Sequence, residues 1–537
     1  MKTYLIAATL TLVGLAACAP NTDVSTSSVV ATQDYTAKSW AAKTLPELSV
    51  ALQNGDVSSE DLVKAYLERI EKIDRSGPGL QSVLALNPNA LADARKLDAH
   101  RAAGETLGSL HGLPILVKDI LETRDPVATT AGSTALKDNM TGRDTPSVAG
   151  LRAAGAVILG KANLSQWANY RSNSSVSGWS SLGGQVRNPH ILDRNPCGSS
   201  SGSGVAAAAS LAAGTVGTET NGSIICPSTV NGIVGFKPTV GLVSQKYIVP
   251  ISSTQDTAGP MTKTVRGAAM MLEAMATGPT KTQYVSTLNA DSLKDARIGV
   301  LRFADGSNAD IIKLFDQAIV DMQDAGATLV EIEKFKPRAD NFWSQSGKLM
   351  KYEFKATMNA YLADAAPAVK TRSLNQLIAF NTKHADVELA LFDQSIFEDA
   401  QTYGPLSDEA YIEAKKLVLS TMRENGIDAL LREHNVDFLV APSGPVPGRI
   451  DPINGDIWPD WAGAGSMAAI AGYPHLTVPM GDVHGLPVGI SFIGGADKDA
   501  DVLSFGYAYE QKTQRRVDPQ YLNTAEDRPE IAKAMKR

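Results

Sequence analysis

The chain is 537 residues long, with 43% hydrophobic and 20% charged residues, a formal net charge of −7 and a pI near 5.6. This composition is typical of a globular protein with enough apolar residues for a large core. The acidic balance excludes the basic face that nucleic-acid-binding proteins need, so we expect no nucleic acid partner. We find no internal repeat and no metal-ligand cluster, and three cysteines are too few for a disulfide framework. We therefore expect no metal site.

Residues 1–17 are predicted to be a signal peptide of the lipoprotein type. One lysine precedes an apolar run from Leu5 to Leu15 that is too short to span a bilayer. The letters LAAC, ending at Cys18, resemble a bacterial lipoprotein box, in which the cysteine becomes the lipidated first residue. Plain secretion with cleavage beside Cys18 is the alternative. Residues 18–39 are polar and unpatterned, as a tether would be. We expect an exported, periplasmic protein that meets the membrane only through this lipid.

After the tether, helical and strand patterns alternate along the chain. Ser58 and Asp61 form a helix start that resembles a capping box, and apolar residues follow at helical spacing. Short apolar runs predict strands, and residues 205–213 predict a helix; the strand runs are Leu113–Val117, Ala156–Leu159, Ile298–Leu301, Leu329–Ile332 and Phe438–Ala441. This alternation predicts one large α/β domain over residues 40–525, a sheet covered by helices. Residues 280–370 have the loosest pattern and read as an insertion, and residues 526–537 as a polar tail.

A run of glycine and serine at 198–204, GSSSGSG, raises the question of a nucleophile. Its first five residues match the G-x-S-x-G nucleophile elbow, with Ser200 as nucleophile. The elbow requires a strand before the turn, and the preceding HILDRNPC is a poor buried strand. Its base would have to be His434, His475 or His484, none of which has a distinctive setting. A run that only lets a helix start close to another backbone is the simpler alternative.

A second cluster accompanies this run, at 218–224, with the letters TETNGSI. Consecutive backbone N–H groups around one serine are what an oxyanion hole requires. Upstream, Lys118 ends the apolar strand in LHGLPILVKDI. A lysine in that place is partly desolvated, which lowers its pKa and allows it to act as a base.

These segments together resemble the amidase signature family. The matching pieces, in order, are GLPILVKD at 112–119, GSSSGS at 198–203, GTETNGSI at 217–224, GIVGFKPTVGLVS at 232–244, and AGYPHLTVPMG and GLPVGISFIG near the C-terminus. The resemblance covers residues 40 to 520 and, within the family, is strongest to bacterial peptide amidases. It implies a central mixed β-sheet with helices on both sides, and chemistry that needs no metal or organic cofactor.

The family uses a Ser–cis-Ser–Lys triad, and the resemblance places each member. The nucleophile falls on Ser223, the bridging serine on Ser199 and the base on Lys118, with a cis peptide at Gly198–Ser199. Two hydroxyls then relay a proton to the lysine, so no histidine is needed. The backbone amides of Thr220, Asn221, Gly222 and Ser223 fall where the family forms its oxyanion hole.

The substrate pocket is less well defined, because this chain departs from the family pattern around it. Asn221 adds a side chain beside the oxyanion hole, Ile225 stands where relatives carry an arginine, and Gln166 where they often carry an acid. Ser200, Asn169 and Arg171 complete the predicted substrate-binding set; a structural hydrogen-bonding role is the alternative for Asn169 and Arg171. Asp256 is expected to order a loop.

Cys197 and Cys226 each lie within three residues of a predicted catalytic serine. In an oxidising compartment they can pair if their Cα atoms lie within about 7 Å. Two buried free thiols are the alternative.

Three functions are consistent with the sequence. The first is an exported amidase that releases ammonia from carboxamides such as C-terminal peptide amides, its partner a small-molecule or peptide amide. The second is a homologue of the family's glutamyl-tRNA(Gln) amidotransferase, against which the signal peptide argues. The third is a non-catalytic lipoprotein on a hydrolase fold, against which the intact triad argues.

Overall fold

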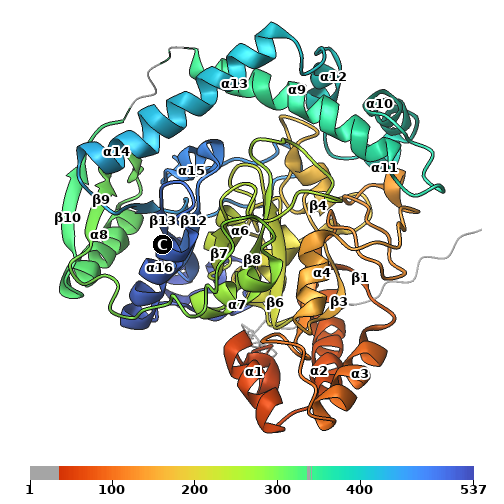
Figure 1. Ribbon diagram of the computed structural model, residues 1–537, viewed down its shortest axis with the longest axis horizontal. Coiled ribbons are helices and arrows are strands. Elements are labelled where there is room, and N and C mark those ends of the chain that lie inside the picture. The colour runs from red at the N-terminus through yellow and green to blue at the C-terminus, as the bar shows by residue number, and fades with distance from the viewer. Residues whose placement is uncertain (1–34, 336–338, 340, 537) are drawn as a thin grey trace, which may run out of the picture. The chain divides into compact units, whose positions relative to one another are not determined.

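An 11-stranded sheet forms the centre of the domain, in the order β1-β3-β2-β6-β8-β7-β12-β13-β11-β9-β10 (Figure 1). Its strands are β1 Val83–Leu86, β2 Pro114–Lys118, β3 Val157–Ala162, β6 Gly214–Glu219, β7 Val234–Lys237, β8 Thr257–Thr262, β9 Arg297–Leu301, β10 Thr328–Ile332, β11 Phe438–Pro442, β12 His475–Val483 and β13 Leu486–Ile493. Strand β2 is parallel to β3 and β6, and β9 is parallel to β10 and β11. The other pairs are antiparallel, so the sheet is mixed. A separate small hairpin joins β4 Trp179–Ser180 to β5 Gly184–Gln185.

Helices flank this sheet in the computed structural model, which describes residues 35–335, 339 and 341–536. The α-helices are α1 Leu45–Asn54, α2 Ser59–Arg69, α3 Ala90–Ala102, α4 Pro146–Ala153, α5 Ser201–Ala208, α6 Ile225–Val230, α7 Val265–Met275, α8 Ala309–Asp324, α9 Phe342–Ala363, α10 Leu374–Lys383, α11 Ala385–Glu388, α12 Ser395–Gln401, α13 Glu409–Met422, α14 Asp428–Glu433, α15 Gly465–Ala471, α16 Asp499–Thr513 and α17 Pro529–Met535. Shorter 3-10 and π turns lie at Ser39–Ala42, Ile70–Arg75, Thr134–Leu136, Gln166–Asn169, Arg302–Ala304, Arg423–Ile427 and Ala525–Asp527. The predicted fold class, one large α/β domain with a mixed sheet, is confirmed.

The five strands predicted from apolar runs are all present, as β2, β3, β9, β10 and β11. The predicted N-cap is also present, because Ser58 Oγ accepts from the Asp61 backbone N at 3.0 Å at the start of α2. The helix predicted over 205–213 is displaced: α5 starts at Ser201 and ends at Ala208. Ser210 has a φ of 61°, which ends helical geometry before β6 begins.

Residues 280–370 are not an insertion, which corrects the prediction. They contain β9 and β10, which form one end of the central sheet, and α8 packs against β10, β11 and β12. The weak pattern has a physical cause, because β10 lies at the sheet edge and alternates exposed and half-buried residues.

Two predicted regions lie at the ends of the chain. The signal peptide and most of the tether, with Cys18, lie outside the described residues. The predicted polar tail, 526–537, contains α17, which has no buried residue.

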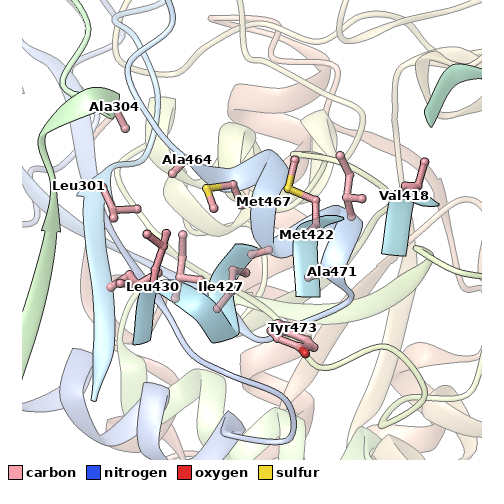
Figure 2. Packing of buried hydrophobic residues seen from close by; sticks show 14 of the residues in the cluster. Leu301, Ala304, Val418, Met422, Ile427, Leu430, Ala464, Met467, Ala471 and Tyr473 are labelled. Atoms are coloured by element: carbon pink, nitrogen blue, oxygen red, sulfur yellow. The ribbon is translucent and has the colours of Figure 1, made fainter. Parts of the chain in front are cut away.

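The long helices α9 and α13 pack side by side on the outside of the domain, next to α14 (Figure 1). Beneath them, a hydrophobic cluster joins these helices to the sheet and to α15 (Figure 2). Its members include Leu301 of β9, Val418 of α13 and Met467 of α15, all buried. This cluster supports α15 from behind, and the first residues of α15 reach the candidate site described below.

Within the described part of the chain, no helix is long and apolar enough to cross a membrane. The same residues contain no group of His, Cys, Asp and Glu side chains that could hold a metal ion.

Candidate active site

Lys118 is the last residue of β2 and lies at the carboxyl end of three adjacent parallel strands, where α/β sheets place their sites. Its side chain is fully buried. Its Nζ lies 2.7 Å from Ser199 Oγ and 2.8 Å from Thr218 Oγ1. Burial lowers the pKa of Lys118 to about 7, against the opposing charges of Asp256 and Glu219. The amine is therefore suited to accept a proton near neutral pH.

Ser199 reaches this lysine from the loop that precedes α5. The peptide bond between Gly198 and Ser199 is cis, as the family resemblance implies. A Cβ atom at position 198 would lie 2.2 Å from Ser165 Oγ, so only glycine fits there. Ser199 is fully buried, and its carbonyl accepts from the Ser165 backbone N at 3.1 Å. These contacts hold the Ser199 hydroxyl against the lysine.

A tight turn follows β6 and carries Ser223 at its end. Glu219 fixes the turn, because its Oε2 accepts from the backbone N of Ile224 at 2.8 Å and of Ile225 at 3.0 Å. Gly222 has a φ of 83°, a conformation that side chains other than glycine rarely adopt. In the described residues, the backbone N–H groups of positions 221–223 donate to no protein acceptor. Three consecutive free donors beside a half-buried serine can hold an oxyanion.

Two links join the Ser199 loop to the Ser223 turn. The Ser200 backbone N donates to the Ser223 carbonyl at 3.2 Å. Cys197 and Cys226 form a disulfide with a Cα–Cα distance of 5.9 Å, which decides between the two alternatives that the sequence left open. Because the cysteines flank the two serines, the disulfide ties the two loops together. No protein hydrogen bond to Ser223 Oγ is present in the described residues, so the contact with Ser199 that a relay requires is not formed here.

The turn is supported from its other side by Asp256, which orders a loop as expected. Its Oδ1 accepts from Thr220 Oγ1 at 2.6 Å, and its Oδ2 accepts from the backbone N of Ile251 and Ser252. Burial raises the pKa of Asp256 to about 6. Glu353 of α9 accepts from Ser252 Oγ at 2.5 Å in turn, so the outer helices connect to the turn through this loop.

A pocket of about 840 Å³ opens beside the turn and is the candidate substrate site. Its lining residues come from several distant parts of the chain: Asn169, Ser177, Cys197, Gly198, Asn221, Gly222, Ile225, Cys226, Ser443, Asp456, Trp458, Trp461, Gly465 and Ser466. Ser466 of α15 donates to Asn221 Oδ1 at 3.2 Å across this pocket. The Asn221 side chain therefore helps to form the pocket wall beside the free amides.

Of the other predicted substrate-binding residues, Asn169 lines the pocket, whereas Ser200 and Arg171 contact the protein itself. Ser200 is fully buried; its Oγ donates to the Thr218 carbonyl at 3.0 Å and accepts from the Thr218 backbone N at 3.1 Å. Arg171 is fully buried and donates to the carbonyls of Glu388 and Phe392. The structure does not support a substrate contact for either, because both side chains are enclosed by protein.

The nucleophile elbow at Ser200 is also not formed. In the described residues, no strand leads from position 191 into the turn, and Ser200 is the N-cap residue of α5. His475 is fully buried, and its pKa is lowered to about 3 by burial. Its Nε2 contacts Ser491 Oγ at 2.7 Å instead of a catalytic serine.

Sequence reasoning missed several residues of this site. Thr218 contacts Lys118, and Glu219 holds the turn; both lie inside the TETNGSI cluster, where only the backbone amides suggested a role. Asp456, Trp458 and Trp461 come from an irregular segment more than 200 residues later, where no periodicity marks them. A pair of tryptophans in a segment without regular structure was the available signal.

This arrangement defines a hydrolase of amide C–N bonds that works from a serine-rich, histidine-free centre. A family model described as Amidase matches residues 61–503, and the chain belongs to this family, the amidase signature enzymes.

Among solved structures, the chain is similar to the native peptide amidase from Stenotrophomonas maltophilia, with 42% identity, a TM-score of 0.84, and coverage of 90% of this chain and 99% of that one. It is 36% identical over 505 residues to probable amidase At4g34880 from Arabidopsis thaliana, covering 89% of this chain and 91% of that protein. It is 34% identical over 507 residues to a glutamyl-tRNA(Gln) amidotransferase subunit from Halorhodospira halophila, covering 88% and 97%. The predicted non-catalytic alternative is therefore wrong.

Proposed function

We propose that this amidase hydrolyses primary carboxamides, such as C-terminal peptide amides, through Ser223, Ser199 and Lys118. The observation that carries the proposal is the buried Lys118 amine, 2.7 Å from Ser199 Oγ, beside a turn with three free backbone amides and a half-buried Ser223. The similarity to a peptide amidase supports the substrate class.

In the proposed cycle, neutral Lys118 takes the proton of Ser199 while Ser199 takes the proton of Ser223. Ser223 Oγ then attacks the carboxamide carbon, and the backbone amides of 221–223 hold the resulting oxyanion. The same relay returns the proton to the leaving nitrogen, which departs as ammonia and leaves an acyl ester on Ser223. Water, deprotonated by the relay, cleaves this ester and releases the carboxylic acid.

Turnover by the purified protein tests this proposal. Incubated alone with a short peptide amide, it should release ammonia and the free acid in equal amounts, and the Ser223→Ala variant should release neither. The amidotransferase alternative requires partner subunits, so turnover by the isolated chain contradicts it. Activity that appears only with added partners and glutamine would overturn the proposal in favour of that alternative.

We also propose that the protein is exported and anchored through Cys18. The lipobox-like LAAC letters support this, and the Cys197–Cys226 disulfide is of the kind that persists in oxidising compartments. Mass spectrometry of the mature N-terminus tests it: an acylated Cys18 is expected. A mature N-terminus beyond Cys18 contradicts the anchor, and a retained Met1 contradicts export.

A further inference from the structure

The substrate pocket contains a single charged side chain among the described residues that line it. This residue is Asp456, in the irregular segment between β11 and α15. The other lining residues are neutral side chains, glycines and the Cys197–Cys226 disulfide. The charge of the pocket is therefore set by one carboxylate.

Neutral donors hold this carboxylate in place. Its Oδ1 accepts from the Ser177 backbone N at 2.9 Å and from Asn195 Nδ2 at 2.7 Å. Its Oδ2 accepts from Ser177 Oγ at 2.5 Å. A carboxylate has about four acceptor sites, so one site on Oδ2 is left. Within the described residues, Asp456 forms no ion pair, and its charge has no protein counter-ion.

Two indole rings stand next to Asp456. Trp458 and Trp461 lie edge to face, with ring centroids 5.6 Å apart and an interplanar angle of 75°. Trp458 packs against the disulfide, whereas Trp461 is 44% exposed at the pocket. The faces of tryptophan rings attract organic cations, and a carboxylate beside them strengthens that attraction. Burial raises the pKa of Asp456, and a bound cation would lower it again.

We propose that this pocket selects amides that carry an organic cation close to the carboxamide, with Asp456 as its counter-ion and Trp458 and Trp461 as its aromatic walls. This proposal rests on the proposed function and deepens it. The cation is an alkylammonium or guanidinium group. It comes either from the free α-amine of an amino-acid amide or from a lysine or arginine side chain of a longer amide.

Binding to the Ser223→Ala protein tests the proposal without requiring turnover. Isothermal titration measures Kd for two pairs of amides: leucinamide against N-acetyl-leucinamide, and N-acetyl-lysinamide against N-acetyl-norleucinamide. We expect the charged member of at least one pair to bind about 10- to 100-fold more tightly, as charge-assisted hydrogen bonds do. The pair that shows the preference identifies the source of the cation.

Substitutions assign the preference to Asp456. In the Ser223→Ala background, Asp456→Asn should remove the preference and leave the Kd of the neutral amides within a few-fold. Asp460→Asn removes an exposed charge from the same segment and should keep the preference. Trp461→Leu, at an exposed position, should reduce it, so the test does not depend on one variant folding.

Equal Kd values for charged and neutral amides would overturn the proposal. So would an Asp456→Asn variant that weakens all four amides equally, because that result assigns Asp456 to loop structure alone. Failure of the proposed function appears separately, as a wild-type protein that binds these amides and does not hydrolyse them.

Discussion

Lys118 Nζ and Ser199 Oγ lie 2.7 Å apart, although 81 positions separate the two residues in the chain. One is fixed by the central sheet and the other by a loop that only glycine at position 198 allows. Their contact places a base beside a hydroxyl at the rigid centre of the fold, and the nucleophile on a turn beside it.

Replacing Lys118 by alanine should reduce kcat by several orders of magnitude while the fold survives. Neutral lysine is the active form, so the wild-type kcat/KM should fall on the acidic side of the lysine pKa, which burial places at about 7. A pH–rate profile checks this, and in Lys118→Ala the acidic limb should flatten. Wild-type-like turnover by folded Lys118→Ala would remove the lysine from the mechanism.

Ser223→Ala should abolish formation of the acyl-enzyme, whereas Ser200→Ala should only lower stability. The Ser200 hydroxyl bridges the backbone N and O of Thr218, so its loss costs on the order of 1–3 kcal/mol of stability. Mass spectrometry after rapid quenching detects the acyl adduct. An adduct that persists in Ser223→Ala and disappears in Ser200→Ala reverses the assignment.

Removing the Glu219 carboxylate should lower kcat through the turn that it holds. In Glu219→Ala the backbone N–H groups of Ile224 and Ile225 lose their acceptor, so the free amides at 221–223 lose their alignment. We expect kcat to fall about 10²- to 10³-fold, as when an oxyanion donor is lost, with KM changed little. Steady-state kinetics measure both constants. Glu219→Gln retains an acceptor oxygen and should recover part of kcat; equal losses in both variants would contradict this role.

Reducing the Cys197–Cys226 disulfide should lower both stability and activity. A bridge with a sequence separation of 29 contributes about 2–4 kcal/mol to stability, and this one also joins the two serine-bearing loops. Thermal melting and amide turnover, each with and without dithiothreitol, measure the effect. The Cys197→Ser, Cys226→Ser double variant is the control and should not respond to the reductant. A wild-type enzyme unaffected by full reduction would show that the loops hold without the bridge.

The sequence predicted the parts of this molecule that depend on local pattern. Apolar runs located β2 and β11, and the lysine that ends β2 is the buried base candidate, because a charge at the end of a buried strand has few other places to go. Pattern failed where long-range packing decides. Arg171 lies in a motif-rich segment, yet its guanidinium packs over Phe392, a residue 221 positions away. Asp456 reaches the pocket only through contacts with Ser177 and Asn195, which no local rule relates to it.

The burial of Lys118 also has a thermodynamic consequence. An unfolded chain keeps this proton up to a pH of about 10.4, whereas the folded chain releases it near 7. The unfolded state therefore binds more protons between these values, and this residue destabilises the fold increasingly as pH falls, with the full cost, roughly 4–5 kcal/mol, below pH 7. Lys118→Met should thus yield an inactive protein that melts at a higher temperature than wild type. The gain should be large at pH 6 and shrink toward pH 10, and a gain independent of pH would show that packing, and not the buried amine, is responsible.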